Sequence, residues 1–214
     1  MLTLLRLVVL ICACELVWSS KQKETRIAGG EFSEIHSRSF QAAIYTRVSG
    51  APPGFCGGAL VHPRWVLTAA HCCYHRGVAV DDVQVILGAH SLYNRYENGR
   101  RVVKVDEIVV HPHWEPSNYD NDIALLKLAS PVQLSGFVVQ LPYRNISSYN
   151  FAGMAATASG WGIPAEGVTF IAPMIREKVM TVMTDTLCDR TFLNELSKNV
   201  VCGYSLDSGT CKVD

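Results

Sequence analysis

Short apolar runs alternate with clusters of turn residues along most of this sequence. The runs are rich in Val, Ile, Leu and Thr, and Gly, Pro, Asn and Ser separate them, as in residues 49–54 and 112–118. Many short strands at this spacing are typical of an all-β sandwich or barrel. We expect strands at residues 41–45, 58–61, 65–68, 83–87, 102–110, 123–128, 155–159, 178–183 and 199–204. Residues 186–196 alone have a helical pattern, with Thr186 or Asp185 as the N-cap.

The N-terminus has a different pattern. A short apolar run within residues 2–14 ends at Glu15, and the small residues Ser19 and Ser20 follow. The run is too short to span a membrane, so it predicts a signal peptide at residues 1–19; a buried N-terminal helix is the alternative. No later stretch is apolar enough to cross a bilayer, which makes a secreted, extracellular product the expectation.

Composition narrows the function class. The chain has 214 residues, of which 49% are hydrophobic, and its formal net charge is zero. That is enough apolar material for one large domain or two small ones, and it argues against disorder. Balanced charge gives no electrostatic basis for binding nucleic acid or an anionic membrane.

The cysteines agree with secretion. Of the eight in the chain, Cys12 and Cys14 lie in the signal segment. Disulfides are the default for those that remain, which are Cys56, Cys72, Cys73, Cys188, Cys202 and Cys211. Structural zinc is the alternative, but no Cys-x-x-Cys pair accompanies a distant His-x-x-x-His. We therefore expect no metal and no cofactor.

Two residues carry candidate chemistry. His71 follows an expected strand, and a Cys56–Cys72 bridge would hold it in place. Asp122 lies at the head of an apolar strand, where a carboxylate needs a partner because burying an unpaired charge is costly. An imidazole held in one tautomer is such a partner in a Ser-His-Asp triad. A hydrogen-bonded structural histidine and a turn aspartate are the alternatives.

The segments WVLTAAHC, DNDIALLKL, SGWG and RIAGG occur in an order and spacing that resemble the chymotrypsin family of serine peptidases. The resemblance implies two six-stranded antiparallel β-barrels with the active site between them. It also implies His71 as the general base and Asp122 as the acid that orients it. The expected function is that of a secreted serine endopeptidase acting on protein or peptide substrates.

The resemblance further implies activation by proteolysis. Arg26–Ile27 matches the zymogen cleavage bond, so the expected organisation is a signal peptide at 1–19, a propeptide at 20–26 and a peptidase domain at 27–214. A basic residue at the bond implies a trypsin-like activating protease. In the family, the freed α-amino group pairs with the aspartate before the nucleophile, and Asp214 is in register with that aspartate.

Cys211 is in register with the cysteine that opens the family's nucleophile motif, Cys-x-Gly-Asp-Ser-Gly-Gly. The chain reads Cys211-Lys212-Val213-Asp214 there, with Val213 in place of the glycine and no serine after it. We expect this 214-residue chain to lack the nucleophile and to be inactive, with its second barrel incomplete. The chain is then either an incomplete record or a non-catalytic homologue that acts as a binding or decoy protein. Ser208 precedes Cys211 and does not fit the nucleophile position.

The remaining expectations concern specificity and modification. Gly209 and Thr210 match the specificity pocket, and Gly209 stands where a trypsin-like enzyme has an aspartate, so the resemblance is to arthropod digestive chymotrypsins and collagenolytic relatives. Loop spacing and the resemblance imply Cys56–Cys72 and Cys188–Cys202 bridges, with Cys73 and Cys211 left over. Asn145 opens a glycosylation sequon. We expect a monomer.

Overall fold

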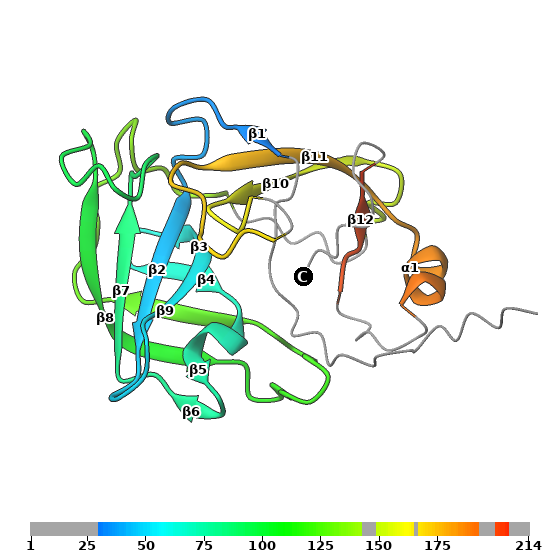
Figure 1. Cartoon of the computed structure of the whole chain (residues 1–214), viewed down its shortest axis with the longest axis horizontal. Helices are drawn as coiled ribbons and strands as arrows, with labels where there is room; N and C mark the ends of the chain where they lie inside the picture. The colour runs from blue at the N-terminus through cyan, green and yellow to red at the C-terminus, as the bar shows by residue number, and fades with distance from the viewer. Residues whose placement is uncertain (1–29, 143–148, 165–166, 193–199, 206–214) are drawn as a thin grey trace, which may run out of the picture.

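A closed antiparallel barrel forms the N-terminal half of the computed structural model, which describes residues 30–142, 149–164, 167–192 and 200–205 (Figure 1). Its six strands follow one another around the barrel in the order β2-β3-β4-β9-β8-β7. The strands are β2 (Gln41–Arg47), β3 (Gly54–His62), β4 (Trp65–Thr68), β7 (Asp82–Leu87), β8 (Arg101–Val110) and β9 (Ala124–Leu128). Pairing of β2 with β7 closes the ring, so the barrel has no free strand edge.

Alternating side chains fill this barrel. In β9, Ala124, Leu126 and Leu128 are buried, whereas the residues between them are partly exposed. This period of two is what a strand with one face on a core requires. The largest fully buried side chains of the barrel core are Ile44, Leu60, Val66, Val85, Leu87, Leu126, Leu128 and Val138.

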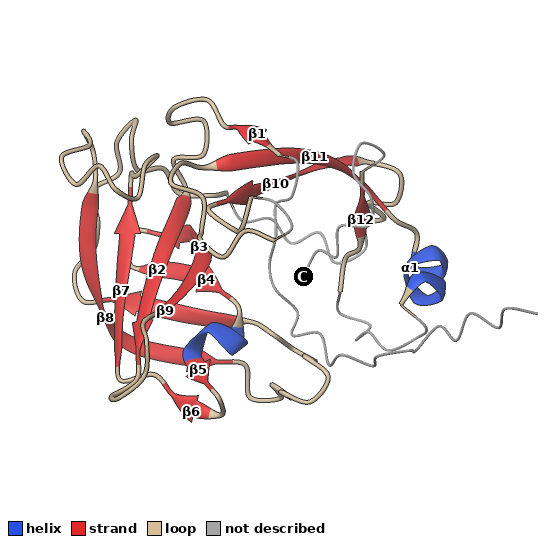
Figure 2. Ribbon diagram, viewed as in Figure 1, coloured by secondary structure: helices blue, strands red, loops and turns tan. Residues whose placement is uncertain are grey.

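The second half of the described chain is an open, four-stranded antiparallel sheet (Figure 2). Its strands are β1 (Glu31–Phe32), β10 (Ala155–Gly160), β11 (Arg176–Val182) and β12 (Gly203–Tyr204). Both β1 and β12 pair with β11, so the N-terminal strand of the described chain joins the C-terminal sheet rather than the barrel. Helix α1 (Asp185–Thr191) follows β11.

A buried tryptophan joins the two halves. Trp161, just after β10, is 1% exposed and packs with Ile86 and Leu92 from the barrel side and Ile175 from the sheet side. Its indole N–H donates to the carbonyl of His90 at 3.1 Å. A buried indole N–H needs a hydrogen-bond partner. This bond supplies the partner and also fixes the position of the Trp161 ring.

Side-chain bonds extend the joint on either side of Trp161. The hydroxyl of Ser159 donates to the Gln41 side-chain carbonyl at 2.9 Å, and Arg38 pairs with Glu177 at 3.0 Å. The sheet is therefore held to the barrel by a packed core with polar contacts around it.

The all-β prediction is confirmed, and each long strand lies where the alternation predicts it. Strand β4 matches at both ends, whereas β12 is two residues long against an expected six, and residues 193–199 lie outside the described ones. The predicted helix cap is wrong: the hydroxyl of Thr184 accepts from the Leu187 N–H, which makes Thr184 the N-cap and neither Thr186 nor Asp185.

Four short elements have no counterpart in the sequence analysis. They are β1, the 3-10 turn η1 (Ala70–Cys73), β5 (Tyr74–His75) and β6 (Val78–Ala79). The three strands have two residues each and η1 is a single turn, so none of them is long enough to show a period. Within the described residues, no helix is long and apolar enough to cross a membrane. The expected signal peptide and propeptide lie outside these residues.

Truncation of the barrel core should cost far more stability than truncation at the surface. Leu126→Ala removes a side chain that is 1% exposed, and we expect it to lower the free energy of unfolding by about 2–5 kcal/mol. Leu134→Ala, at a position 45% exposed, is the matched control and should stay within about 0.5 kcal/mol. Urea unfolding of the two variants and the parent chain measures both values. Equal losses would contradict the assigned core.

Candidate active site

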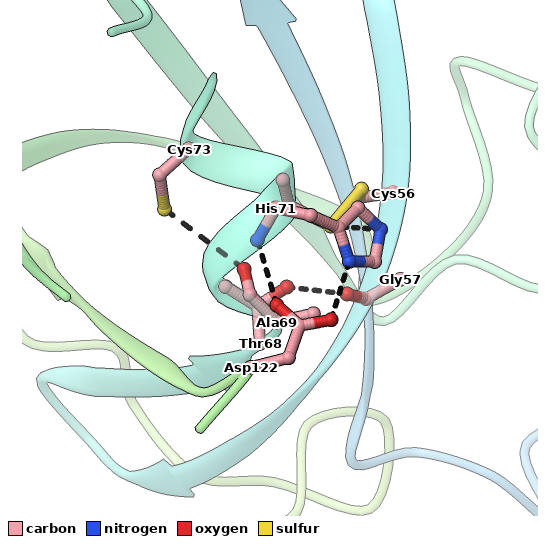
Figure 3. Close-up of a disulfide and its surroundings, with 8 residues drawn as sticks. Cys56, Gly57, Thr68, Ala69, His71, Cys73 and Asp122 are labelled. Carbon is pink, nitrogen blue, oxygen red and sulfur yellow. Dashed lines mark hydrogen bonds and ion pairs between the residues drawn. A yellow bond between two sulfur atoms is a disulfide. The ribbon is translucent and has the colours of Figure 1, made fainter. Parts of the chain in front are cut away.

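A disulfide holds the short turn that carries His71. Cys56 on β3 is bonded to Cys72 on η1, with their Cα atoms 6.1 Å apart (Figure 3). The hydroxyl of Thr68, the last residue of β4, donates to the Gly57 carbonyl at 2.8 Å. Both links tie the chain around His71 back to β3, so the imidazole is presented from a fixed backbone.

Strand pairing brings Asp122 to the same place. Strands β4 and β9 are antiparallel neighbours, and Thr68 pairs with Ala124. His71 lies just after the end of β4, and Asp122 lies just before the start of β9. In an antiparallel pair, the end of one strand is level with the start of its partner. The ladder therefore delivers both side chains to one end of the barrel.

The two side chains form a two-point contact. The imidazole Nδ1 of His71 lies 2.7 Å from Oδ2 of Asp122, and the backbone N–H of His71 donates to Oδ1 at 2.8 Å. An ionised carboxylate only accepts hydrogen bonds, so Nδ1 carries the proton and Nε2 of the neutral ring is left as the acceptor. The arrangement can take up a proton at Nε2 and stabilise the resulting imidazolium.

The charge on Asp122 is stabilised locally. Burial by itself would raise the pKa of Asp122, but hydrogen bonds from the ring and backbone of His71, together with the electrostatic attraction of His71 and the backbone N–H of Ala70, outweigh it. The net pKa of this carboxyl is below its ordinary value. Asp122 is therefore ionised at neutral pH, as the tautomer of His71 requires.

The sulfur atoms near the ring do not make a metal site. Cys56, His71 and Cys72 place one potential ligand atom each within 4.8 Å of one another, and the Sγ of Cys72 lies 3.5 Å from Nε2 of His71. Metal binding by cysteine requires a thiolate, and these two sulfurs are bonded to each other. The cluster is accounted for by the disulfide beside the imidazole.

Cys73 is the free cysteine of the described residues, and it is buried. Burial, aided by the negative charge of Asp122, raises the pKa of its thiol to about 11. Figure 3 shows its sulfur turned away from the imidazole, toward the Ala69 carbonyl at 4.0 Å. A thiol that is protonated at neutral pH and faces the core is not a nucleophile for this site.

The structure also forms the second predicted disulfide, Cys188–Cys202, which links α1 to the residue before β12. The other site predictions lie outside the described residues. These are Arg26 and Ile27 at the cleavage bond, Asn145, Gly209 and Thr210 of the pocket, Asp214, and with them Ser208 and Cys211.

Sequence reasoning missed one neighbour of His71. Tyr119 places its ring at a centroid distance of 5.9 Å from the imidazole, in an edge-on arrangement at 70°. It sits in a polar turn with no apolar period, so the pattern gives it no weight. Its position three residues before Asp122 is the one signal that could have drawn attention to it.

Comparison with known proteins gives consistent matches. The sequence model of the family described as "Trypsin" matches residues 27–214. Trypsin V-A of Rattus norvegicus is 30% identical over 198 residues, which cover 91% of this chain and 74% of that protein. Brachyurin of Leptuca pugilator is 30% identical over 191 residues, covering 88% and 78%. A solved structure described as "Structure of GrC" has a TM-score of 0.75 and 29% identity, covering 84% of this chain and 76% of its own.

Replacement of Asp122 should change stability in a pH-dependent way. A carboxyl with a lowered native pKa stabilises the fold above the ordinary Asp value of about 3.9, and loses that contribution as the pH falls through the lower native value. We expect Asp122→Asn to be less stable than the parent chain at pH 7, and the difference to shrink below about pH 4. Urea unfolding across this pH range tests it.

The control for this experiment is Asp106→Asn, which alters an exposed carboxyl on β8. It should leave stability nearly unchanged at every pH. A loss in Asp122→Asn that has the same size at pH 7 and at pH 2 would show that the charge on Asp122 is not what its neighbours stabilise.

Proposed function

Because the chain belongs to the trypsin family of serine peptidases, we propose that His71 is the general base of a secreted endopeptidase and that Asp122 orients it. The observation that supports this most is the 2.7 Å contact between His71 Nδ1 and Asp122, backed by the second bond from the His71 backbone. These bonds leave Nε2 as the proton acceptor. The substrates of the family are proteins and peptides.

The proposed reaction is acyl transfer. Nε2 of His71 takes the proton of a serine hydroxyl as its oxygen bonds to the scissile carbonyl carbon. The imidazolium, stabilised by Asp122, then gives that proton to the leaving amine as the carbon–nitrogen bond breaks. In the second half, Nε2 of His71 takes a proton from water as the water oxygen bonds to the acyl carbon, and the imidazolium returns that proton to the serine oxygen as the ester bond breaks. The serine of this scheme is not among the residues that the sequence analysis assigns, and Ser208 is not proposed for it.

We further propose export and proteolytic activation. Residues 1–19 are the signal peptide, residues 20–26 the propeptide, and a trypsin-like protease cuts between Arg26 and Ile27. The new α-amino group of Ile27 would pair with Asp214. Two disulfides, Cys56–Cys72 and Cys188–Cys202, support an oxidising compartment. In that compartment we propose a monomer with a glycosylated Asn145.

An alternative is a non-catalytic homologue that binds rather than cleaves. The observation that favours it is Val213, which stands in place of the glycine whose backbone N–H belongs to the oxyanion hole in the family. Both proposals share the His71–Asp122 geometry, and they differ in whether a serine ever reacts.

The 214-residue polypeptide, cut after Arg26 with trypsin and freed of it, should show no turnover and no labelling by a fluorophosphonate. Loss of a triad serine costs on the order of 10⁶ in turnover in subtilisin, so the expected activity is below detection. The assay combines a chymotrypsin substrate with mass spectrometry of the labelled peptides. His71→Ala treated identically is the control. Stoichiometric, His71-dependent labelling of any serine, including Ser208, would show that the nucleophile has been misplaced.

We propose a preference for large apolar residues over Lys and Arg, because Gly209 removes the carboxylate that would pair with a basic side chain at the pocket base. The test uses a form that carries residues 20–214 followed by a reactive serine, and that is activated by cleavage after Arg26. Gly209→Asp should shift its cleavage toward Lys and Arg in a peptide library, and Gly209→Asn, of the same size, should not. An exclusive basic preference in the parent form would refute the proposal.

A further inference from the structure

Two aromatic rings, those of Trp114 and Tyr119, connect the barrel core to the imidazole of His71. Trp114 packs against the buried cluster of the barrel. The ring of Tyr119 lies edge-on to Trp114, with centroids 5.8 Å apart at 68°, and edge-on to His71 at 5.9 Å and 70°. Such T-shaped contacts are the favoured geometry between aromatic rings. The row therefore connects the imidazole to a well-packed part of the fold.

The backbone around Tyr119 is specialised for this placement. Tyr119 has φ of 59° and Asn121 has φ of 56°, in the left-handed region that few residues other than glycine adopt. Residues held there tend to be over-determined by their surroundings and to lie near functional sites. Here both flank Asp120, immediately before Asp122.

Hydrogen bonds fix this conformation. The N–H of Glu115 donates to the Asp120 carbonyl at 3.0 Å, and the side-chain amide of Asn121 donates to the His113 carbonyl at 2.9 Å. Both bonds cross the loop, so they hold its two arms together with Tyr119 between them. The direction of the Tyr119 side chain is thus set by the loop that also positions Asp122.

The imidazole of His71 needs such support. Its side chain is 35% exposed, and its ring is hydrogen-bonded to Asp122 through Nδ1. A ring bonded in this way can still pivot about that bond or change rotamer, which would move Nε2 away from a reacting group. A shift of about 1 Å in a catalytic group is enough to slow a reaction by roughly a hundredfold.

We propose that Tyr119 is a positioning residue that holds the imidazole of His71 in its Asp122-bonded orientation, with Trp114 as its backing. The contact that supports this role is the edge-on one between its ring and the imidazole. Tyr119 is also 37% exposed, so its ring is not simply core filling. The inference rests on the proposed function in treating His71 as the base, and the experiment separates the two.

The test is proton NMR of the 214-residue chain with ¹⁵N-labelled histidine, which detects the Nδ1 proton that His71 donates to Asp122. That resonance should be present in the parent chain and in Tyr119→Phe. It should broaden and disappear in Tyr119→Leu, because the ring leaves Asp122 and its proton exchanges with water. Tyr96→Leu, at a fully exposed tyrosine of the same barrel, should leave the resonance unchanged. Dispersed amide resonances confirm that each variant is folded.

Each other outcome has a definite meaning. A sharp, unshifted resonance in Tyr119→Leu would overturn the inference, and so would its loss in Tyr119→Phe, since the hydroxyl would then be the positioning group. If Tyr119→Leu fails to fold, Trp114→Leu decides: withdrawing the backing should broaden the resonance, and an unchanged line overturns the inference. Asp122→Asn should abolish the resonance. Its persistence there would refute the proposed His71–Asp122 pair itself, independently of Tyr119.

Discussion

The antiparallel pairing of β4 with β9 brings the two functional side chains of the site together. The two strands are separated in sequence by the whole of β5 to β8, yet their register places Thr68 opposite Ala124. His71, just after β4, and Asp122, just before β9, therefore lie next to each other at this end of the ladder. A slip of one residue in a strand turns every side chain to the opposite face. The packed barrel core therefore also maintains the register on which the His71–Asp122 contact depends.

At the end of this ladder, several polar contacts stabilise the charged form of the Asp122 carboxylate. The acid is partly buried, which alone would favour its neutral form, and the His71 backbone, the His71 ring and the Ala70 backbone reverse that preference. The donors come from η1, which the Cys56–Cys72 disulfide fastens to β3. Covalent, electrostatic and strand-pairing constraints thus converge on one imidazole.

The sequence predicts the parts of this arrangement that repeat. Strands such as β9 alternate buried and exposed residues, and that period is visible without coordinates. The His71–Asp122 contact spans 51 residues. A carboxylate at the head of an apolar strand needs a partner, which made an imidazole a candidate, and the family resemblance then paired the two residues. The cap at Thr184 and the contact of Tyr119 with His71 depend on backbone angles and loop closure. Neither produces a periodic pattern in the sequence.

The strand β1 has a consequence for the order in which the chain can fold. Every barrel strand lies between residues 41 and 128 and the barrel core extends to Val138, so this unit can close before β10 and β11 have been synthesised. β1 cannot join it, because its partner is β11, and the nearby Arg38–Glu177 pair spans 139 residues. Strand β1 therefore cannot form its strand pairing until β11 has been synthesised. The pairing of β1 is a late step in folding that requires the second half of the chain.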